Sequence, residues 1–386
     1  MLAYSFYESD NRVRRYAETL IRQGYEVDAV TLGKNGELFY GSLNRVNIYR
    51  IQQRIRNEKY KLSYLYRLVK FFIKSTIFIS KRHMHRPYDL IHVHSVPDFE
   101  VFATFFAKMS GARIILDIHD IVPELYANKF NIKEKSLVFK TLTFIEKISI
   151  AFSDHVIIAN HVWEKTLTSR STKKEKCTTI MNYPDPSIFY SRRAERKKSK
   201  FVVIYPGTIN WHQGVDIAVR AFSRLKEEAP EAELHIYGDG PMRASIQQLV
   251  DDLGLQASVI LKETLPLEQI AIAMSSADLG IVPKRNDSFG GGAFSTKILE
   301  FMALGIPVVV AETRIDRYYF NDRIVKFFEP ENAGDLAKVI TELIRDKELR
   351  KRIASNASAF VSEYTWDKKE KDYLSIVEKL VQQKVH

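Results

Sequence analysis

The chain has 386 residues, which is too long for one ordinary hydrophobic core and favours two domains. Hydrophobic residues make up 45% and charged residues 27%, as in globular proteins, and no run is long and apolar enough to span a bilayer. The single cysteine, Cys177, cannot form an internal disulfide, and the first residues lack the pattern of a secretory signal. We therefore expect a soluble or peripheral protein of the cytoplasm.

The net charge of +11 is concentrated in one segment. Between Arg50 and Arg86 there are eleven Lys or Arg residues and one acid, Glu58, which gives a local charge of +10. A uniformly basic chain would suggest nucleic-acid binding, whereas a single basic segment indicates one binding face.

Apolar runs alternate with amphipathic stretches along the whole chain, which predicts an α/β protein built on parallel sheets with helices on both faces. In the first half we expect strands at 2–7, 25–32, 46–51, 89–94, 113–118 and 154–159, and helices at 11–22, 98–109 and 136–152. The stretch 182–200 is rich in proline, serine and charge and breaks this periodicity. We therefore predict a first doubly wound domain at 1–185 and a linker at 186–200.

The same pattern restarts after the linker. Strands are expected at 201–206, 233–238, 258–262, 278–283 and 307–311, and helices near 333–345, 347–363 and 366–383. This predicts a second doubly wound domain at 201–365 and a final helix at 366–386. In open sheets of this kind, ligands bind beyond the carboxyl ends of the strands, so we expect two facing domains to share one cleft.

Glycines follow two strands of the second domain. Gly207 and Gly214 enclose the loop after the strand at 201–206, and Gly238 and Gly240 follow the next strand, with Pro241 at the first helical turn. Glycines at such junctions let backbone N–H groups approach an anion at the start of a helix. The alternative is that each loop is an ordinary turn.

The segment 284–300 has the most residues of types that bind phosphate groups. Lys284 and Arg285 follow a strand, and after three consecutive glycines a helix opens near Ser295. The start of a helix offers free N–H groups and a positive dipole end to a phosphate, and Lys297 adds a full charge. Glu300 could accept hydrogen bonds from ribose hydroxyls, although it could also be a solvated helix residue.

Histidines end two strands of the first domain. The strand at 113–118 is followed by His119 and Asp120, and the strand at 89–94 ends on His94, so both imidazoles could reach one cleft. The alternative is that they are structural. We expect no metal site, because no third histidine or cysteine has ligand spacing and no Asp-x-Asp pair occurs. The negative charge of a bound diphosphate would then be neutralised by cationic side chains and backbone amides.

Four segments, in this order, resemble retaining glycosyltransferase family 4: YPGTINWHQGVDIAVRAF, IYGDGP, ADLGIVP and STKILEFMALGIPVVVAE. ESDNRVRRYAETLIRQGYEV and LDIHDIVPEL extend the likeness over nearly the whole chain. The resemblance implies the GT-B fold, in which two doubly wound Rossmann-like domains face each other across a cleft and the C-terminal helix returns to the first domain.

The resemblance also implies roles for individual residues. Glu300 would bind the donor ribose, Gly238 and Gly240 would line the nucleotide pocket, and His119 would face the acceptor and the reacting sugar. The expected catalytic residues are His119, Asp120, Lys297 and Glu300. The expected donor-binding residues are Gly207, Thr208, His212, Gln213, Gly238, Gly240, Arg285, Ala293, Phe294, Ser295 and Thr296, of which 293–296 would offer amides to the phosphates and the sugar. No cofactor is expected besides the nucleotide-sugar substrate.

The chain departs from the family pattern at the diphosphate. Thr208 and Gln213 stand where the family commonly has Arg and Lys, and Gly292 stands eight positions before Glu300, where it commonly has another Glu. Lys284, Arg285 and Lys297 are the nearest cations that could replace the missing pair. We place Lys297 first because it lies at the start of a helix.

Within the basic segment 50–86, the stretch 60–80 has the pattern of an amphipathic helix. Its apolar residues recur at helical spacing: Leu62, Leu65, Tyr66, Val69, Phe72, Ile73 and Ile77. Such a helix binds an anionic membrane surface. The alternative is that its apolar face packs on the sheet, and both can hold for different faces. Nucleic acid is not expected, because the aromatic residues lie on the apolar face.

The expected function is transfer of a hexose or N-acetylhexosamine, with retention and without a metal, from a UDP- or GDP-sugar to a lipid-linked saccharide. This would take place at the inner face of the cell membrane, in surface polysaccharide synthesis. Two alternatives remain open: a UDP-sugar epimerase or hydrolase of the same fold, and a non-catalytic subunit that binds a membrane-associated partner.

Overall fold

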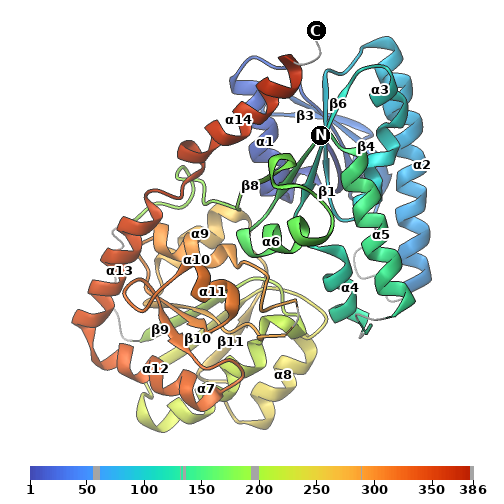
Figure 1. Ribbon diagram of the computed structural model, residues 1–386. Helices are drawn as coiled ribbons and strands as arrows, with labels where there is room; N and C mark the ends of the chain where they lie inside the picture. The colour runs from blue at the N-terminus through green and yellow to red at the C-terminus, as the bar shows by residue number, and fades with distance from the viewer. Residues whose placement is uncertain (55–60, 131, 134–135, 193–199, 288, 383–386) are drawn as a thin grey trace. The chain divides into compact units, whose positions relative to one another are not determined.

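The computed structural model describes residues 1–54, 61–130, 132–133, 136–192, 200–287 and 289–382. Its contacts divide the chain into two units (Figure 1). Unit 1 comprises Met1–Asn182 and Glu370–His386, and unit 2 comprises Tyr183–Lys369. Each unit is built around one sheet flanked by helices, which confirms the predicted α/β class with two Rossmann-like parts.

The described part of unit 1 contains an eight-stranded sheet in the order β3-β4-β2-β1-β5-β6-β7-β8. Its strand pairs are parallel except for β3 with β4, which are antiparallel. The strands are β1 (Leu2–Phe6), β2 (Asp28–Gly33), β3 (Tyr40–Leu43), β4 (Val46–Gln53), β5 (Leu90–His94), β6 (Arg113–Ile118), β7 (His155–Ile158) and β8 (Cys177–Thr179). The order reverses between β1 and β5, so the carboxyl ends of these strands mark the ligand-binding edge of the sheet.

Helices cover both faces of this sheet. They are α1 (Asn11–Arg22), α2 (Lys61–His85), the 3₁₀ helix η2 (Asp98–Thr104), α3 (Phe105–Met109), α4 (Val122–Phe130), α5 (Leu137–Phe152) and α6 (His161–Arg170). The side chains of Asp10, Ser136 and Asn160 cap α1, α5 and α6 by accepting a backbone N–H three residues on. The C-terminal helix α14 (Trp366–Gln382) places the fully buried Tyr373 against Tyr16 and His92.

Within its described residues, unit 2 contains a six-stranded sheet in the order β11-β10-β9-β12-β13-β14, with every pair parallel. The strands are β9 (Phe201–Pro206), β10 (Ala232–Tyr237), β11 (Val259–Lys262), β12 (Leu279–Val282), β13 (Val308–Ala311) and β14 (Lys326–Phe328). The helices are α7 (Val215–Glu228), α8 (Arg243–Asp252), α9 (Leu267–Ser275), α10 (Thr296–Ala303), α11 (Arg314–Tyr319), α12 (Ala333–Arg345) and α13 (Lys347–Val361). The order reverses between β9 and β12, so a ligand is expected beyond their carboxyl ends.

Most predicted elements are present with nearly the predicted bounds. The helix expected at 11–22 is α1 with the same bounds, whereas the one expected at 98–109 divides into η2 and α3. The strands β3, β8 and β14 were not predicted. They are three or four residues long, and β3 is an exposed edge strand, so none of them carries a long apolar run.

Helix α2 uses two different apolar faces. Leu68, Phe71 and Ile79 are buried in unit 1, as the sheet-packing alternative requires. The opposite face exposes Leu65, Tyr66, Val69, Ile73 and Ile77. Phe72 is half-buried, whereas the side chain of Leu62 and residues 55–60 lie outside the described residues.

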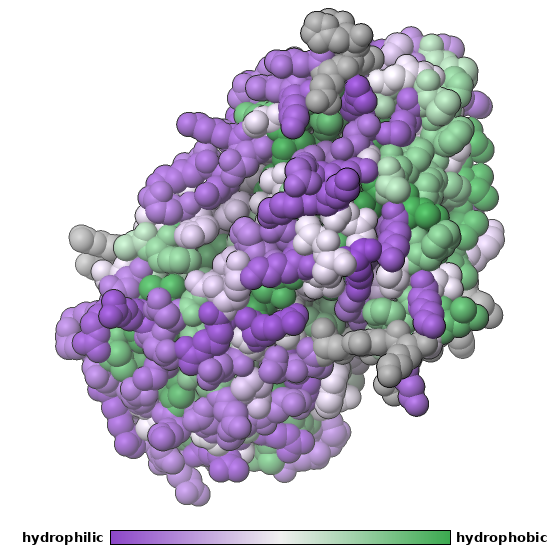
Figure 2. Space-filling model, viewed as in Figure 1, coloured by the Kyte–Doolittle hydropathy of each residue, from purple (hydrophilic) through white to green (hydrophobic). Residues whose placement is uncertain are grey.

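The exposed apolar residues of α2 belong to a larger surface, which we call the apolar face of unit 1. Its other members are Phe105, Phe106 and Met109 of α3 and Leu137, Val138, Phe144 and Ile148 of α5. Figure 2 shows hydrophobic residues gathered along the side of unit 1 where Figure 1 places α2 and α5. None of the helices in the described part of the chain is both long and apolar enough to cross a membrane.

Candidate functional site

The loops that follow β9 and β12 pack backbone against backbone in unit 2. Gly214 has a φ of +64°, and a Cβ at this position would overlap the carbonyl oxygen of Pro283. The Arg285 N–H donates to the His212 carbonyl at 2.9 Å. The sequence therefore needs a glycine before α7, because no side chain fits between the two loops.

Lys297 lies across the loop after β9. Its ammonium group is 3.4 Å from Gln213 Oε1 and 5.5 Å from the centre of the Tyr205 ring. A Cβ on Gly207 would overlap the Lys297 side chain. Tyr205 in turn donates its hydroxyl to the Thr208 carbonyl at 2.7 Å. The loop thus holds a lysine cation, supplied by α10, beside its own backbone.

Burial lowers the pKa of Lys297 to about 8, and the Glu300 carboxylate opposes this shift. Glu300 is half-buried on α10, one turn further along the helix. At neutral pH the lysine is therefore mostly protonated. An anion that replaced water beside it would bind more strongly than at an exposed lysine, because the local dielectric is lower.

The other two candidate cations already have carboxylate partners. Lys284 Nζ is 2.9 Å from Asp316 Oδ2 and donates to the Ala293 carbonyl at 2.6 Å. Arg285 contacts both Asp216 oxygens at 2.7 and 3.0 Å and stacks 3.5 Å above the Trp211 ring. Their charges are therefore largely used to hold the loops in place.

The glycine-rich segment closes on itself before α10 begins. Asp287 Oδ1 accepts the N–H groups of Phe289 and Gly290 at 3.0 and 2.6 Å. The Ala293 N–H donates to the Phe289 carbonyl at 2.9 Å. Two groups expected to contact the donor, the guanidinium of Arg285 and the amide of Ala293, already make hydrogen bonds within unit 2.

Ser295 and Thr296 stand at the start of α10, where the first N–H groups of a helix have no intrahelical acceptor. Ser295 does not cap the helix with its side chain, and its Oγ is buried without a hydrogen-bond partner among the described residues. Phe294 packs edge-on against Tyr319. The amides of the first turn and the Ser295 hydroxyl are thus suited to an anion.

The remaining predicted donor residues lie at the same edge of the sheet. Gly238 packs so closely on Gly207 that a Cβ would overlap the Gly207 carbonyl oxygen, and Gly240 packs in the same way on Ile209. His212 is half-buried edge-to-face with Phe289, and burial lowers its pKa. The structure thus brings the predicted donor residues of unit 2 together around the ends of β9, β10 and β12.

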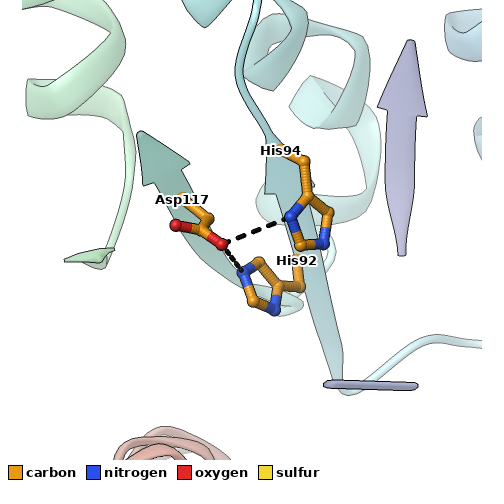
Figure 3. A group of neighbouring side chains, drawn as sticks. All are labelled: His92, His94 and Asp117. Atoms are coloured by element: carbon orange, nitrogen blue, oxygen red, sulfur yellow. Dashed lines mark ion pairs between the residues drawn. The ribbon is translucent and has the colours of Figure 1, made fainter. Parts of the chain in front are cut away.

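In unit 1, the two predicted histidines meet. His94 Nδ1 and His119 Nε2 are 3.1 Å apart, and each lies 3.3 Å from Asp117 Oδ2. His92, on the same face of β5 as His94, stacks on it with 4.2 Å between ring centres (Figure 3). Asp120 follows His119 and is half-buried.

Asp117 is held by an arginine from α1. Arg12 Nε and Nη2 donate to the two Asp117 oxygens at 2.8 and 2.7 Å, and both side chains are buried. Burial alone would raise the pKa of Asp117, but Arg12 and the neighbouring imidazoles outweigh this effect and hold it well below its usual value. Burial lowers the pKa of His92 to about 4 and lowers that of His94 as well. The cluster therefore contains an ionised carboxylate beside the neutral imidazoles of His92 and His94.

His92, His94 and Asp117 have the ligand types and spacing of a metal site, with their nearest ligand atoms within 4.8 Å of one another. The Arg12 guanidinium, however, already contacts the carboxylate oxygen that a metal would use. A divalent ion there would lie next to a fixed positive charge. The residues therefore suit a hydrogen-bonded cluster better than a metal ion.

Two family models together match residues 10–360. The model described as Glycosyltransferase Family 4 matches 10–187, and the model described as Glycosyl transferases group 1 matches 188–360. The chain belongs to the GT-B glycosyltransferases of family 4.

Relatives of this glycosyltransferase are distant but cover most of its length. An uncharacterized glycosyltransferase from Methanocaldococcus jannaschii is 24% identical, over 93% of this chain and 91% of its own. The sulfoquinovosyl transferase SQD2 of Arabidopsis thaliana is also 24% identical, over 92% of this chain and 67% of its own.

Solved structures support the fold. The sucrose-phosphate synthase of Thermosynechococcus elongatus superposes with a TM-score of 0.82 at 18% identity, covering 99% of this chain and 98% of its own. Anabaena HepE in complex with UDP and glucose superposes with a TM-score of 0.73 at 17% identity, covering 98% of each chain. At these identities the likeness shows the GT-B fold alone.

Three residues of this glycosyltransferase's histidine cluster were missed at the sequence level: Arg12, His92 and Asp117. The alternation His92-Val-His94 places both imidazoles on one face of a strand, so this signal was available. Asp117 is a charged residue within the apolar run 114–118, which indicates a buried partner. Nothing in the sequence identifies Arg12 as that partner, because the two residues are 105 positions apart.

Proposed function

We propose that this glycosyltransferase moves a hexose or N-acetylhexosamine from a UDP- or GDP-sugar to a lipid-linked saccharide, with retention and without a metal ion. The observation that carries the donor part is the position of Lys297 beside Gly207 and the first turn of α10. A cation and a helix start can together neutralise two phosphates. Glu300, on the same helix, would accept hydrogen bonds from the ribose hydroxyls.

In the proposed reaction, the bond between the anomeric carbon and the diphosphate oxygen breaks, and the acceptor oxygen bonds to the same face of that carbon. The acceptor hydroxyl gives its proton to the leaving diphosphate oxygen. Lys297 and the N–H groups of α10 stabilise the negative charge that develops on the diphosphate. His119 would position the reacting sugar.

Calorimetry of the full chain with UDP, GDP and their common sugar conjugates tests the donor part. We expect one of the two nucleoside diphosphates to bind and its sugar conjugates to compete for the same site. Absence of binding by all of them would contradict the proposal and favour a non-catalytic subunit. Release of free sugar, or conversion to an epimer, without any acceptor would favour the hydrolase or epimerase alternative.

The apolar face of unit 1 supports the lipid-linked acceptor and a position on an anionic membrane. Lys70, Lys81, Lys140 and Lys147 are exposed on α2 and α5, two of the three helices that carry this face. An apolar surface bordered by lysines suits an interface where aliphatic and aromatic groups enter the acyl boundary and cations meet anionic headgroups. Each lysine near such a surface contributes about 1 kcal/mol.

Flotation with vesicles that contain phosphatidylglycerol tests this part. The double variant Ile73→Ser, Ile77→Ser removes two half-exposed aliphatic groups from α2, at 51% exposure each, and we expect weaker binding. Ile272→Ser is the matched control, because Ile272 is 55% exposed on α9 of unit 2. Equal flotation of both variants and the unchanged protein would contradict the membrane proposal.

A further inference from the structure

The ring protons of His94 and His119 in the histidine cluster of unit 1 can be arranged in more than one way. His94 Nδ1 lies 3.1 Å from His119 Nε2, and the two nitrogens form a hydrogen bond when one of them donates and the other accepts. Asp117 Oδ2 lies 3.3 Å from both nitrogens and can only accept, because Arg12 keeps this carboxylate ionised. The geometry allows His94, His119 or both to donate, because Asp117 Oδ2 can accept from each nitrogen. The shorter His94–His119 contact, 3.1 Å against 3.3 Å, favours one donor and one acceptor between the two rings.

The surroundings of His94 decide which of its own two nitrogens carries the proton. Its side chain is 1% exposed, and its Nε2 has no hydrogen-bond partner among the described residues. A neutral imidazole carries one proton, so His94 must place it either on this isolated Nε2 or on Nδ1, which faces the carboxylate. A buried N–H without an acceptor is rare in proteins, whereas a bare ring nitrogen leaves only an unused lone pair.

We propose that Asp117 and Arg12, acting through His94, fix His119 as the tautomer with its proton on Nδ1. His94 then donates its Nδ1–H towards Asp117 and His119, and His119 accepts at Nε2. The His119 side chain is 24% exposed, whereas Asp117 is fully buried, so the inner nitrogen of His119 is held by the cluster and the outer nitrogen is left for substrate. His119 therefore presents a hydrogen-bond donor, suited to a hydroxyl or phosphate oxygen.

In this arrangement Asp117, Arg12 and His94 are positioning residues, and His119 is the only member that would touch substrate. The inference rests on the proposed role of His119 at the reacting sugar. Its first test needs no activity, because the two ring nitrogens of a histidine have different ¹⁵N shifts when protonated and when bare. A wrong proton arrangement and a wrong role of His119 in the reaction can therefore be told apart.

The test is long-range ¹H–¹⁵N correlation on the full chain labelled with ¹⁵N-histidine, in which a His119→Asn variant assigns the His119 signals. We expect a protonated Nδ1 and a bare Nε2 for His119. In His94→Leu, the carboxylate becomes the only nearby acceptor of the cluster for His119 Nε2, at 3.3 Å, so we expect the proton to move to Nε2. A His119 that is protonated at Nε2 in the unchanged protein would overturn the proposal.

His92→Leu is the matched control. His92 is also buried, lies 3.7 Å from the same Asp117 oxygen and stacks on His94. Its Nδ1 bonds to the Tyr373 hydroxyl at 3.1 Å rather than to His119. We expect this variant to leave the His119 tautomer unchanged, and a change of tautomer equal to that in His94→Leu would refute the specific role of His94.

Sugar transfer provides the second readout. His94→Leu should lower kcat by up to about tenfold with little change in the donor KM, because one neutral hydrogen bond to the reacting sugar is lost. His92→Leu should keep kcat. A tautomer change in His94→Leu with an unchanged kcat would support the proton arrangement and contradict the role of His119 in the reaction.

Discussion

Replacing Lys297 by methionine should weaken binding of the nucleoside diphosphate without affecting the nucleoside. The Lys297 ammonium group lies beside Gly207, whereas Lys284 and Arg285 are held by Asp316 and Asp216. A hydrogen bond to a charged group contributes about 1.5–3 kcal/mol net. Because about 1.4 kcal/mol corresponds to a factor of ten, we expect the Kd for the diphosphate to rise by about 10- to 150-fold.

The assay is calorimetry with UDP or GDP and with the matching nucleoside. Lys326→Met is the control, because Lys326 is half-buried in the same unit but pairs with Glu342 on α12 at 2.8 Å. It should leave the diphosphate Kd unchanged. An equal diphosphate Kd for Lys297→Met and the unchanged protein would refute the assignment of the phosphate site.

The pKa of Lys297 gives this prediction a second, independent measurement. With a pKa of about 8, Lys297 is about half protonated at pH 8 before binding. A bound diphosphate favours the charged form, so binding at pH 8 should take up about half a proton, seen as a dependence of the heat on the buffer's ionisation enthalpy. Affinity should fall as the pH rises above 8. Lys297→Arg should bind without this proton uptake.

Three further predictions concern buried groups. Asp316→Asn leaves the Lys284 ammonium buried without its carboxylate and should lower the free energy of unfolding by about 3–5 kcal/mol in urea, and Asp316→Leu with Lys284→Met should recover much of this loss. Burial, weakly opposed by the Ser75 hydroxyl, raises the pKa of Glu100 to about 8. Protonated Glu100 contributes fully to the free energy of unfolding below its unfolded pKa, and this contribution is lost as the pH rises towards 8. The free energy of unfolding that Glu100→Gln gains over the unchanged protein should therefore grow by about 1.4 kcal/mol per pH unit between about pH 4.5 and 8. A difference that stays constant with pH would contradict this pKa. Gly238→Ala should cost about 1–3 kcal/mol and weaken diphosphate binding, because the new Cβ overlaps the Gly207 carbonyl; unchanged melting and binding would contradict the close approach.

The fold could be predicted because long parallel strands and their helices carry strong periodic signals. The runs at 113–118 and 201–206 are apolar almost throughout, as in strands covered on both faces. Three-residue strands such as β8 and β14 carry too few residues for a pattern, and their pairing is decided by the neighbouring strand.

The candidate site was predicted unevenly, for physical reasons. Sequence order placed Gly207, Lys297 and Glu300 in one region, because strand ends and helix starts can be located from periodicity. Periodicity could not show that Arg285 pairs with Asp216, because this contact forms only when the loop after β12 packs on the first turn of α7, 69 positions away in the sequence. The same holds for Arg12 and Asp117, which lie 105 positions apart and pair only in the folded unit 1.

The central claim is transfer with retention from a nucleotide sugar, and the anomeric configuration of the product tests it most directly. The full chain would be incubated with the donor found by calorimetry and with lipid-linked saccharides in phosphatidylglycerol vesicles. NMR of the first product would then give the configuration of the new glycosidic bond. We expect release of the nucleoside diphosphate and a glycosidic bond with the same configuration as in the donor. An inverted bond, or a donor that binds but is never transferred, would contradict it.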